Sequence, residues 1–247
     1  MLNDTQRLTI HGAWWIRHET LEESADRVVT TFQKLCNLNS SWAHWYKPHR
    51  RPEDKLHIEN QALSSHETVM RQLEISQEPD GNGDTSEDLG YTLSVLSEPR
   101  TGKGIARSLL QVRCCSRTQN SGFNTISLEL PQFRFSQEIY KERILSHAVA
   151  ELADIWEPDW IAVWDLQTHL TQEPWPPKPA FGWINYLSPK TGKLLSLPSG
   201  WRWSDLGSEK QIYVHCGGPP DRTNPSHAEN FRRLFANIEW AVGKSLP

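Results

Sequence analysis

The sequence predicts an α+β fold, in which mixed, largely antiparallel β-sheets pack with about four helices. Two observations lead to this prediction. Apolar and polar residues alternate in several short runs, which is typical of half-buried strands, and capping signals precede stretches with apolar residues at helical spacing. The 247 residues show no internal repeat and no sharp change of composition. We therefore expect a single domain, residues 1–247. Its length allows a division into two lobes, of about residues 1–130 and 131–247.

The amino-terminal part predicts a strand followed by a helix. Residues 7–15 alternate in character, so they are expected to form the first strand. Thr20 and Glu23 then have the spacing of a capping box, which satisfies two backbone donors at the start of a helix. Apolar residues at helical spacing continue to Cys36, and a weaker helix is expected between residues 65 and 75.

Three alternating runs predict an antiparallel meander in the middle of the chain. The runs cover residues 91–95, 106–114 and 126–130, and turn-rich segments connect them at 98–104 and 117–124. Before them, residues 78–90 hold five carboxylates, three glycines and a proline but no basic residue, so this segment should be a solvated loop.

The carboxyl-terminal half predicts two further helices among strands. A helix from about Ser136 should end before Pro158 and bury one stripe, and a second helix should begin with a capping box in residues 225–229. Strands are expected at 160–164, 181–187 and 211–216, with a turn at 188–192 and a stiff proline-rich loop at 173–179. The two predicted stripes are Tyr140, Ile144, Ala148, Leu152 and Ile155, and Phe231, Leu234, Phe235, Ile238 and Val242.

Charge and composition argue against several classes of partner. The net charge is -4, so the chain as a whole does not attract phosphate backbones or anionic lipids, and neither a nucleic acid nor a membrane partner is expected. Nowhere do eighteen apolar residues run together, and the start of the chain does not resemble a signal peptide. We therefore expect a soluble, cytoplasmic protein whose four cysteines are reduced thiols.

No intact catalytic or metal-binding motif is found, so no catalytic residue, metal or cofactor is predicted. The run from His66 to Met70 begins like a zinc-protease helix, but methionine stands where the second histidine ligand belongs. No Gly-x-Ser-x-Gly elbow occurs either. One enzymatic alternative stays open, because a site can assemble from distant segments, such as His44 or His215 with Asp159 or Asp165.

Twelve tryptophans indicate a protein built for packing and contact. Those on predicted strands are expected in the core: Trp14, Trp15, Trp160, Trp164 and Trp183. Those in predicted loops or short irregular segments are the better candidates for exposed anchors: Trp42, Trp45, Trp175, Trp201 and Trp203.

The ordered motifs together resemble the immunity protein 52 family of bacterial polymorphic toxin systems. The resemblance rests on the run Gly12-Ala13-Trp14-Trp15, the helix that begins at Thr20, and Trp45-Tyr46 after that helix. It also rests on Pro158-Asp159-Trp160 and on the run from Gly182 to Ser188, which is Gly-Trp-Ile-Asn-Tyr-Leu-Ser. The chain departs from the family pattern at Ile16, where the family often has glycine, and in its added acidic loop.

The resemblance implies a non-enzymatic inhibitor that binds one toxin made by the same bacterium. Such a toxin is commonly a restriction-endonuclease-like nuclease delivered by a contact-dependent route such as type VI secretion. A nuclease cleft must attract phosphate, so carboxylates and aromatic anchors can occupy it. The residues expected to bind the toxin are Glu78, Asp80, Asp84, Glu87, Asp88, Trp42, Trp45 and Trp175. The alternatives are the enzyme named above, metal-dependent or hydrolytic, and an adaptor that loads an effector for secretion.

Overall fold

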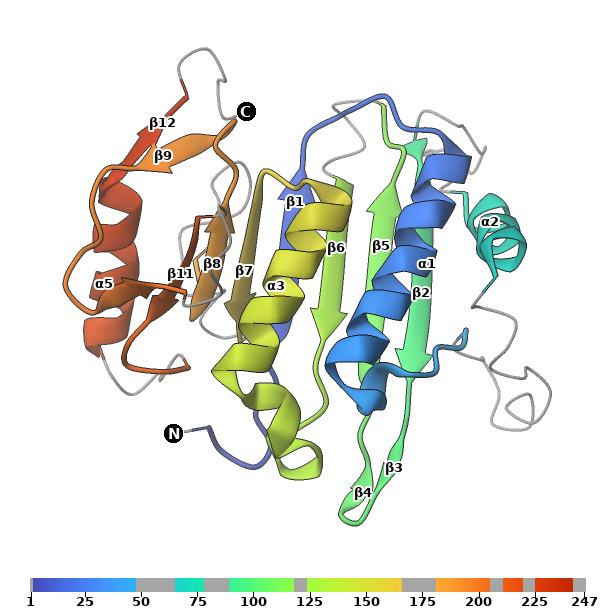
Figure 1. Cartoon of the computed structure of the whole chain (residues 1–247), viewed down its shortest axis with the longest axis horizontal. Coiled ribbons are helices and arrows are strands. Elements are labelled where there is room, and N and C mark those ends of the chain that lie inside the picture. Colours follow the sequence, from blue (N-terminus) through green and yellow to red (C-terminus); the bar gives the residue numbers. More distant parts are fainter. Residues whose placement is uncertain are drawn as a thin grey trace. The chain divides into compact units, whose positions relative to one another are not determined.

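The computed structural model describes residues 2–47, 65–77, 89–117, 124–165, 181–204, 211–219 and 225–241. The chain divides into two compact units, and each combines helices with antiparallel strands (Figure 1). Unit 1 comprises Met1–Gly12 and Gln132–Pro247, and unit 2 comprises Ala13–Pro131. The described residues contain four α-helices, and all strand pairings given below are antiparallel, which confirms the predicted α+β class.

A three-stranded meander forms the sheet of unit 2, as the alternating runs predicted. The strands β2 (Tyr91–Ser97), β5 (Ser108–Cys114) and β6 (Asn124–Glu129) lie in the order β6-β5-β2. Leu93 pairs with Val112, which pairs in turn with Ile126, and all three side chains are buried. Residues opposite each other across antiparallel strands share a face, so the apolar alternation builds one buried face.

Two helices of unit 2 lie side by side, α1 (Leu21–Leu38) and α2 (His66–Glu74), and both were predicted (Figure 1). The capping box is confirmed at the start of α1. The hydroxyl of Thr20 accepts from the backbone N–H of Glu23 at 3.1 Å, and the carboxylate of Glu23 accepts from the backbone N–H of Thr20 at 2.8 Å. The hydrogen bonds that the Glu23 carboxylate accepts from the backbone N–H and from the hydroxyl of Thr20 lower the pKa of Glu23, because they stabilise its ionised form.

Two features of unit 2 were not predicted. A short hairpin of β3 (Arg100–Thr101) and β4 (Gly104–Ile105) occupies part of the turn-rich segment between β2 and β5. In addition, a 3-10 turn, η1 (Ser40–Trp42), follows α1 and turns the chain back onto β2. Tyr46 and Leu96 exchange backbone hydrogen bonds of 2.9 and 2.7 Å, so this segment covers part of the outer edge of β2.

Four strands of unit 1 are hydrogen-bonded in the order β10-β11-β8-β7: β10 (Trp201–Trp203), β11 (Ile212–His215), β8 (Ile184–Leu187) and β7 (Trp160–Trp164). Every residue of β7 and β8 is buried, which confirms the expected covered strand at 160–164. The first strand, β1 (Thr9–Trp14), follows β7 in this order and begins in unit 1. Its His11 ring stacks on Trp164 at 5.2 Å.

The helix after Ser136 exists, but its buried stripe differs from the predicted one. A 3-10 turn, η7 (Gln137–Tyr140), precedes α3 (Glu142–Trp156), which ends before Pro158 as expected. Tyr140 belongs to η7, and the extended backbone of Lys141 separates it from α3, so it cannot begin a helical stripe of α3. The observed buried stripe runs through Leu145, Val149, Leu152 and Trp156. Ile144 and Ile155 are only half-buried.

The last helix starts earlier and ends sooner than predicted. It is α5 (Pro225–Ala236), with proline at its first position, where the missing N–H costs nothing. The predicted capping box is therefore wrong, because Ser226 lies inside the helix and Glu229 pairs instead with Arg232 and Arg233. Ile238 belongs to β12 (Ile238–Trp240), which forms a second small sheet with β9 (Gly192–Leu194).

Candidate functional site

Six of the eight residues predicted to bind a toxin lie outside the described residues: Glu78, Asp80, Asp84, Glu87, Asp88 and Trp175. The structure does fix the two ends of the acidic segment. Gln77, which follows α2, forms a β-bridge with Tyr91 at the start of β2, and the N–H of Thr92 donates to the carbonyl of Ser76 at 3.1 Å. The residues on either side of the acidic segment therefore meet at the edge of β2.

The other two residues, Trp42 and Trp45, are buried, so the prediction that they stand exposed is wrong. Their exposed fractions are 0% and 3%. The indole N–H of Trp42 donates to the hydroxyl of Ser108 on β5 at 3.2 Å, and Trp45 stacks on Phe32 of α1 at 5.7 Å. Because η1 and the bridge at Tyr46 return the chain to β2, both rings fill the core of unit 2.

Trp203 is the exposed member of the loop tryptophans within the described part of the chain, with 46% of its surface accessible. Trp201 is buried, and its ring meets His215 at 5.1 Å and Phe231 at 5.8 Å. The tryptophans expected in the core are confirmed there, except that Trp15 is half-buried: Trp14, Trp160, Trp164 and Trp183.

Trp203 ends a row of aromatic side chains on one face of β10 and β11. Trp201 pairs with His215 and Trp203 pairs with Tyr213, so all four side chains share a face. Phe231 and His227 of α5 pack against the His215 end of this row. At the other end the ring of Trp203 lies edge-on to the buried ring of Tyr213 at 6.0 Å. The row therefore begins beneath α5 and ends at the surface.

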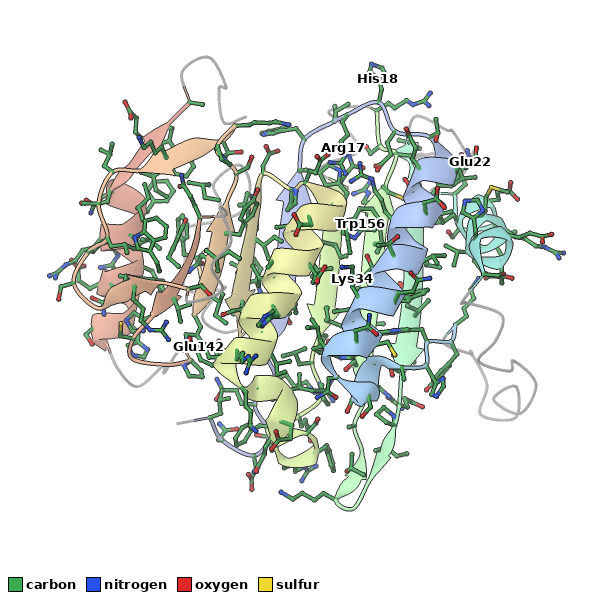
Figure 2. All side chains as sticks on the ribbon, in the orientation of Figure 1. Arg17, His18, Glu22, Lys34, Glu142 and Trp156 are labelled. Carbon is green, nitrogen blue, oxygen red and sulfur yellow. The ribbon has the colours of Figure 1, made fainter. Side chains whose placement is uncertain are left out.

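The opposite face of β10 is held by an ion pair. Arg202 points away from the aromatic row, because neighbouring residues of a strand alternate. Its guanidinium forms an ion pair with Glu142, the first residue of α3, which Figure 2 labels. This pair ties the edge strand to α3 and neutralises the positive charge beside Trp203.

Two buried histidines of unit 1 contact each other. The rings of His215 and His227 lie 4.8 Å apart, and Nε2 of His215 is 3.0 Å from the side-chain nitrogen of Asn230. Burial and the neighbouring His227 lower the pKa of His215, because both disfavour its cationic form. A side chain at position 217 would place its Cβ 2.7 Å from the His215 ring, so only glycine fits there.

The pairs considered for a distant enzymatic site have other contacts in the described residues. The carboxylate of Asp165 accepts from Gln6 at 2.8 Å, and Asp159 accepts from Thr191 at 2.8 Å. His44 is exposed in unit 2. In the described ranges, no three or more His, Cys, Asp or Glu side chains are arranged to hold a metal ion.

Unit 2 carries a further charged region at the start of α1, which the sequence analysis did not single out. Glu19 is buried and pairs with Arg27 at 2.9 Å and with Arg17 at 3.5 Å. Glu22 and Asp26 of α1 are exposed nearby, and Figure 2 shows Arg17, His18 and Glu22 at this same end of the unit. The Thr20 capping box and its acidic first turn were signals of this region in the sequence.

Comparison with known proteins places these features in a family. No curated protein sequence matches the chain. A solved structure described as "Pseudomonas aeruginosa T6SS protein PA0821" has a similar fold, with a TM-score of 0.51 and 13% identity over 95% of this chain and 74% of that one. Among the described residues, no helix has the length and apolar character needed to cross a membrane. The family model described as Immunity protein 52 matches residues 9–234, which is most of the chain. The chain therefore belongs to the Immunity protein 52 family.

Proposed function

We propose that this protein binds and neutralises a cognate secreted toxin and thereby protects the cell that produces it, and its kin. The observation that carries the proposal is the match to the Immunity protein 52 family over residues 9–234. The family implies a partner that is a toxin protein and a role without catalysis. A binding role also fits a chain that exposes an indole on an anchored edge strand, since tryptophan is enriched among the residues that dominate protein interfaces.

We further propose that the toxin is a restriction-endonuclease-like nuclease, delivered by type VI secretion and met in the cytoplasm. The solved structure with a similar fold is that of a T6SS protein, which supports this route. The net charge of -4 and the five carboxylates between Glu78 and Asp88 support a basic partner, because a nuclease must attract phosphate. Acidic side chains at such a cleft would compete with its substrate and speed association.

The test is co-expression with the polypeptide encoded by the adjacent gene. We expect growth to be rescued and the two chains to purify as one complex. Replacement of the five carboxylates, each by its amide counterpart Asn or Gln, should slow association and make its rate less dependent on salt. Unchanged association kinetics would exclude the role of the acidic segment, and the absence of both rescue and complex would exclude the proposed function.

The same experiment separates the two other classes of function. A complex in which the bound toxin keeps its full activity would identify an adaptor that loads an effector. Rescue without a complex, accompanied by a chemical change in the toxin or its product, would identify an enzyme.

A further inference from the structure

We infer that the partner docks on the outer edge of β10, where a short extended segment of the partner pairs with the strand and covers the indole of Trp203. This inference rests on the proposed function, because it assigns the surface through which the toxin is bound. It concerns unit 1 alone and is independent of the acidic segment of unit 2.

The hydrogen-bond register of β10 leaves some of its backbone groups without a bond to β11, and these groups point outward at this edge. The N–H of Cys216 donates to the carbonyl of Gly200 at 2.8 Å, and the N–H of Ser204 donates to the carbonyl of Ile212 at 2.9 Å. Antiparallel ladders alternate, so between these two pairs Arg202 is the residue that bonds to β11. The backbone groups of Trp201 and Trp203 consequently point outward.

Two of these outward groups have no hydrogen-bond partner in the part of the chain that the structure describes. The N–H of Trp201 donates to Pro198 at 3.1 Å, and the carbonyl of Trp203 accepts from the Arg202 side chain at 3.4 Å. The two outward groups that remain without a hydrogen-bond partner among the described residues are the carbonyl of Trp201 and the N–H of Trp203. They flank Arg202, and one residue of an added parallel strand satisfies both when its N–H donates to the first and its carbonyl accepts from the second.

The two edge strands β2 and β10 differ in how their outer sides are covered. The segments around Tyr46 and Ser76 form backbone hydrogen bonds with β2 from outside, and so occupy its edge. Edge strands left open are usually protected by their shortness, by a charged residue or proline, or by a bulge. β10 is short, but its charged residue Arg202 is paired with Glu142, and the strand presents a tryptophan with 46% of its surface exposed.

The indole of Trp203 is supported from one side. It lies against the fully buried ring of Tyr213, while the ion pair between Arg202 and Glu142 lies on the other face of the strand. A tryptophan side chain has only two χ angles, so it loses little conformational entropy when a partner orders it. This is the character of a residue that dominates an interface.

The chemical character of this edge favours a protein segment as its ligand. A neutralised arginine, an indole and two neutral backbone groups offer nothing specific to a phosphate, but they match an extended peptide that places an apolar side chain over Trp203. A second copy of this chain fits less well. Two-fold symmetric pairing about Arg202 is antiparallel and would need the N–H of Trp201, which already donates to the carbonyl of Pro198.

Hydrogen exchange on the complex with the adjacent gene's polypeptide tests this surface. We expect the amide of Trp203 to exchange rapidly in the free chain and to be protected in the complex. Trp203→Ala should weaken binding by roughly tenfold or more, as truncation of a central tryptophan does, and Trp203→Phe should restore part of it. The matched control is Leu195→Ala, because Leu195 is apolar, lies in unit 1 and is 64% exposed. It should leave the affinity unchanged.

Each other outcome has a defined meaning. If the unaltered chain binds and protects, but Trp203→Ala binds equally well and the amide gains no protection, this surface assignment is overturned and the proposed function stands. If the amide becomes protected in the free chain as its concentration rises, the occupant is a second copy and the assignment is also overturned. If the unaltered chain neither binds nor protects, both proposals fail.

Discussion

Replacement of Trp42 by alanine should destabilise unit 2 severely. The side chain is completely buried, and burying an aromatic ring removes about 150–250 Å² from water. At about 25 cal/mol per Å², this corresponds to about 4–6 kcal/mol. The substitution also deprives the buried hydroxyl of Ser108 of its indole partner, which costs about 1 kcal/mol, while partial collapse of the cavity offsets some of the loss. We expect a net loss of about 3–5 kcal/mol, the usual range for such changes.

Urea denaturation followed by circular dichroism measures this loss. With a slope of about 2 kcal/mol per M, a loss of about 4 kcal/mol moves the midpoint by about 2 M. Hydrogen exchange should show the loosening in α1 and β5, which contact the ring and its neighbour Trp45. The matched substitution Trp203→Ala should cost less than half as much, because its indole is half exposed. A change below about 0.5 kcal/mol for Trp42→Ala would show that this residue is outside the core and would refute the reasoning.

Three further outcomes are expected. The pKa of His215 is lowered in the folded state, so the unfolded chain binds protons more readily at this residue. The contribution of His215 to stability is therefore complete above about pH 6.5 and is lost as the pH falls below that value. Urea midpoints at pH 5 and 7.5 for the unaltered chain and for His215→Asn check this, and equal midpoints for the unaltered chain would contradict it. Gly182→Ala should cost more than about 3 kcal/mol, because the added Cβ would lie 2.0 Å from the backbone oxygen of Val163, whereas Gly102→Ala, with open space around it, should change thermal stability little. Thr20→Ala should lose about 1 kcal/mol by removing the cap of α1, and a thermal midpoint equal to that of the unaltered chain would argue against the capping box.

Local signals explain what could be predicted of the fold. The capping box at Thr20 and the alternation in β2, β5 and β6 are read from neighbouring residues, and the structure confirms them. The start of α5 was misplaced because Pro225 and Ser226 compete as helix starts. The strands β9 and β12 contain three residues each and pair with each other from distant parts of the sequence, so no local period marks them.

The candidate site was harder to predict, because exposure depends on contacts across the chain. Trp42 and Trp45 look like loop residues in the sequence, yet the bridge between Tyr46 and Leu96 returns them to the core. Trp203 carried a usable signal. The run Trp201-Arg202-Trp203 alternates, follows a turn with Pro198 and Gly200, and precedes the predicted strand at 211–216, which is the pattern of two paired strands. The sequence could not show which of the two indoles α5 would cover.

Titration of the toxin's activity with this protein tests the central claim most directly, which is that protection comes from binding alone. Purified toxin, the product of the adjacent gene, is mixed with increasing amounts of the chain, and its residual activity is measured at several times after mixing. A stoichiometric inhibitor should abolish activity at about one mole per mole, independently of time, with an end point that matches complex formation. Complete loss of activity at far lower ratios, progressing with time, would show catalytic turnover and contradict the account.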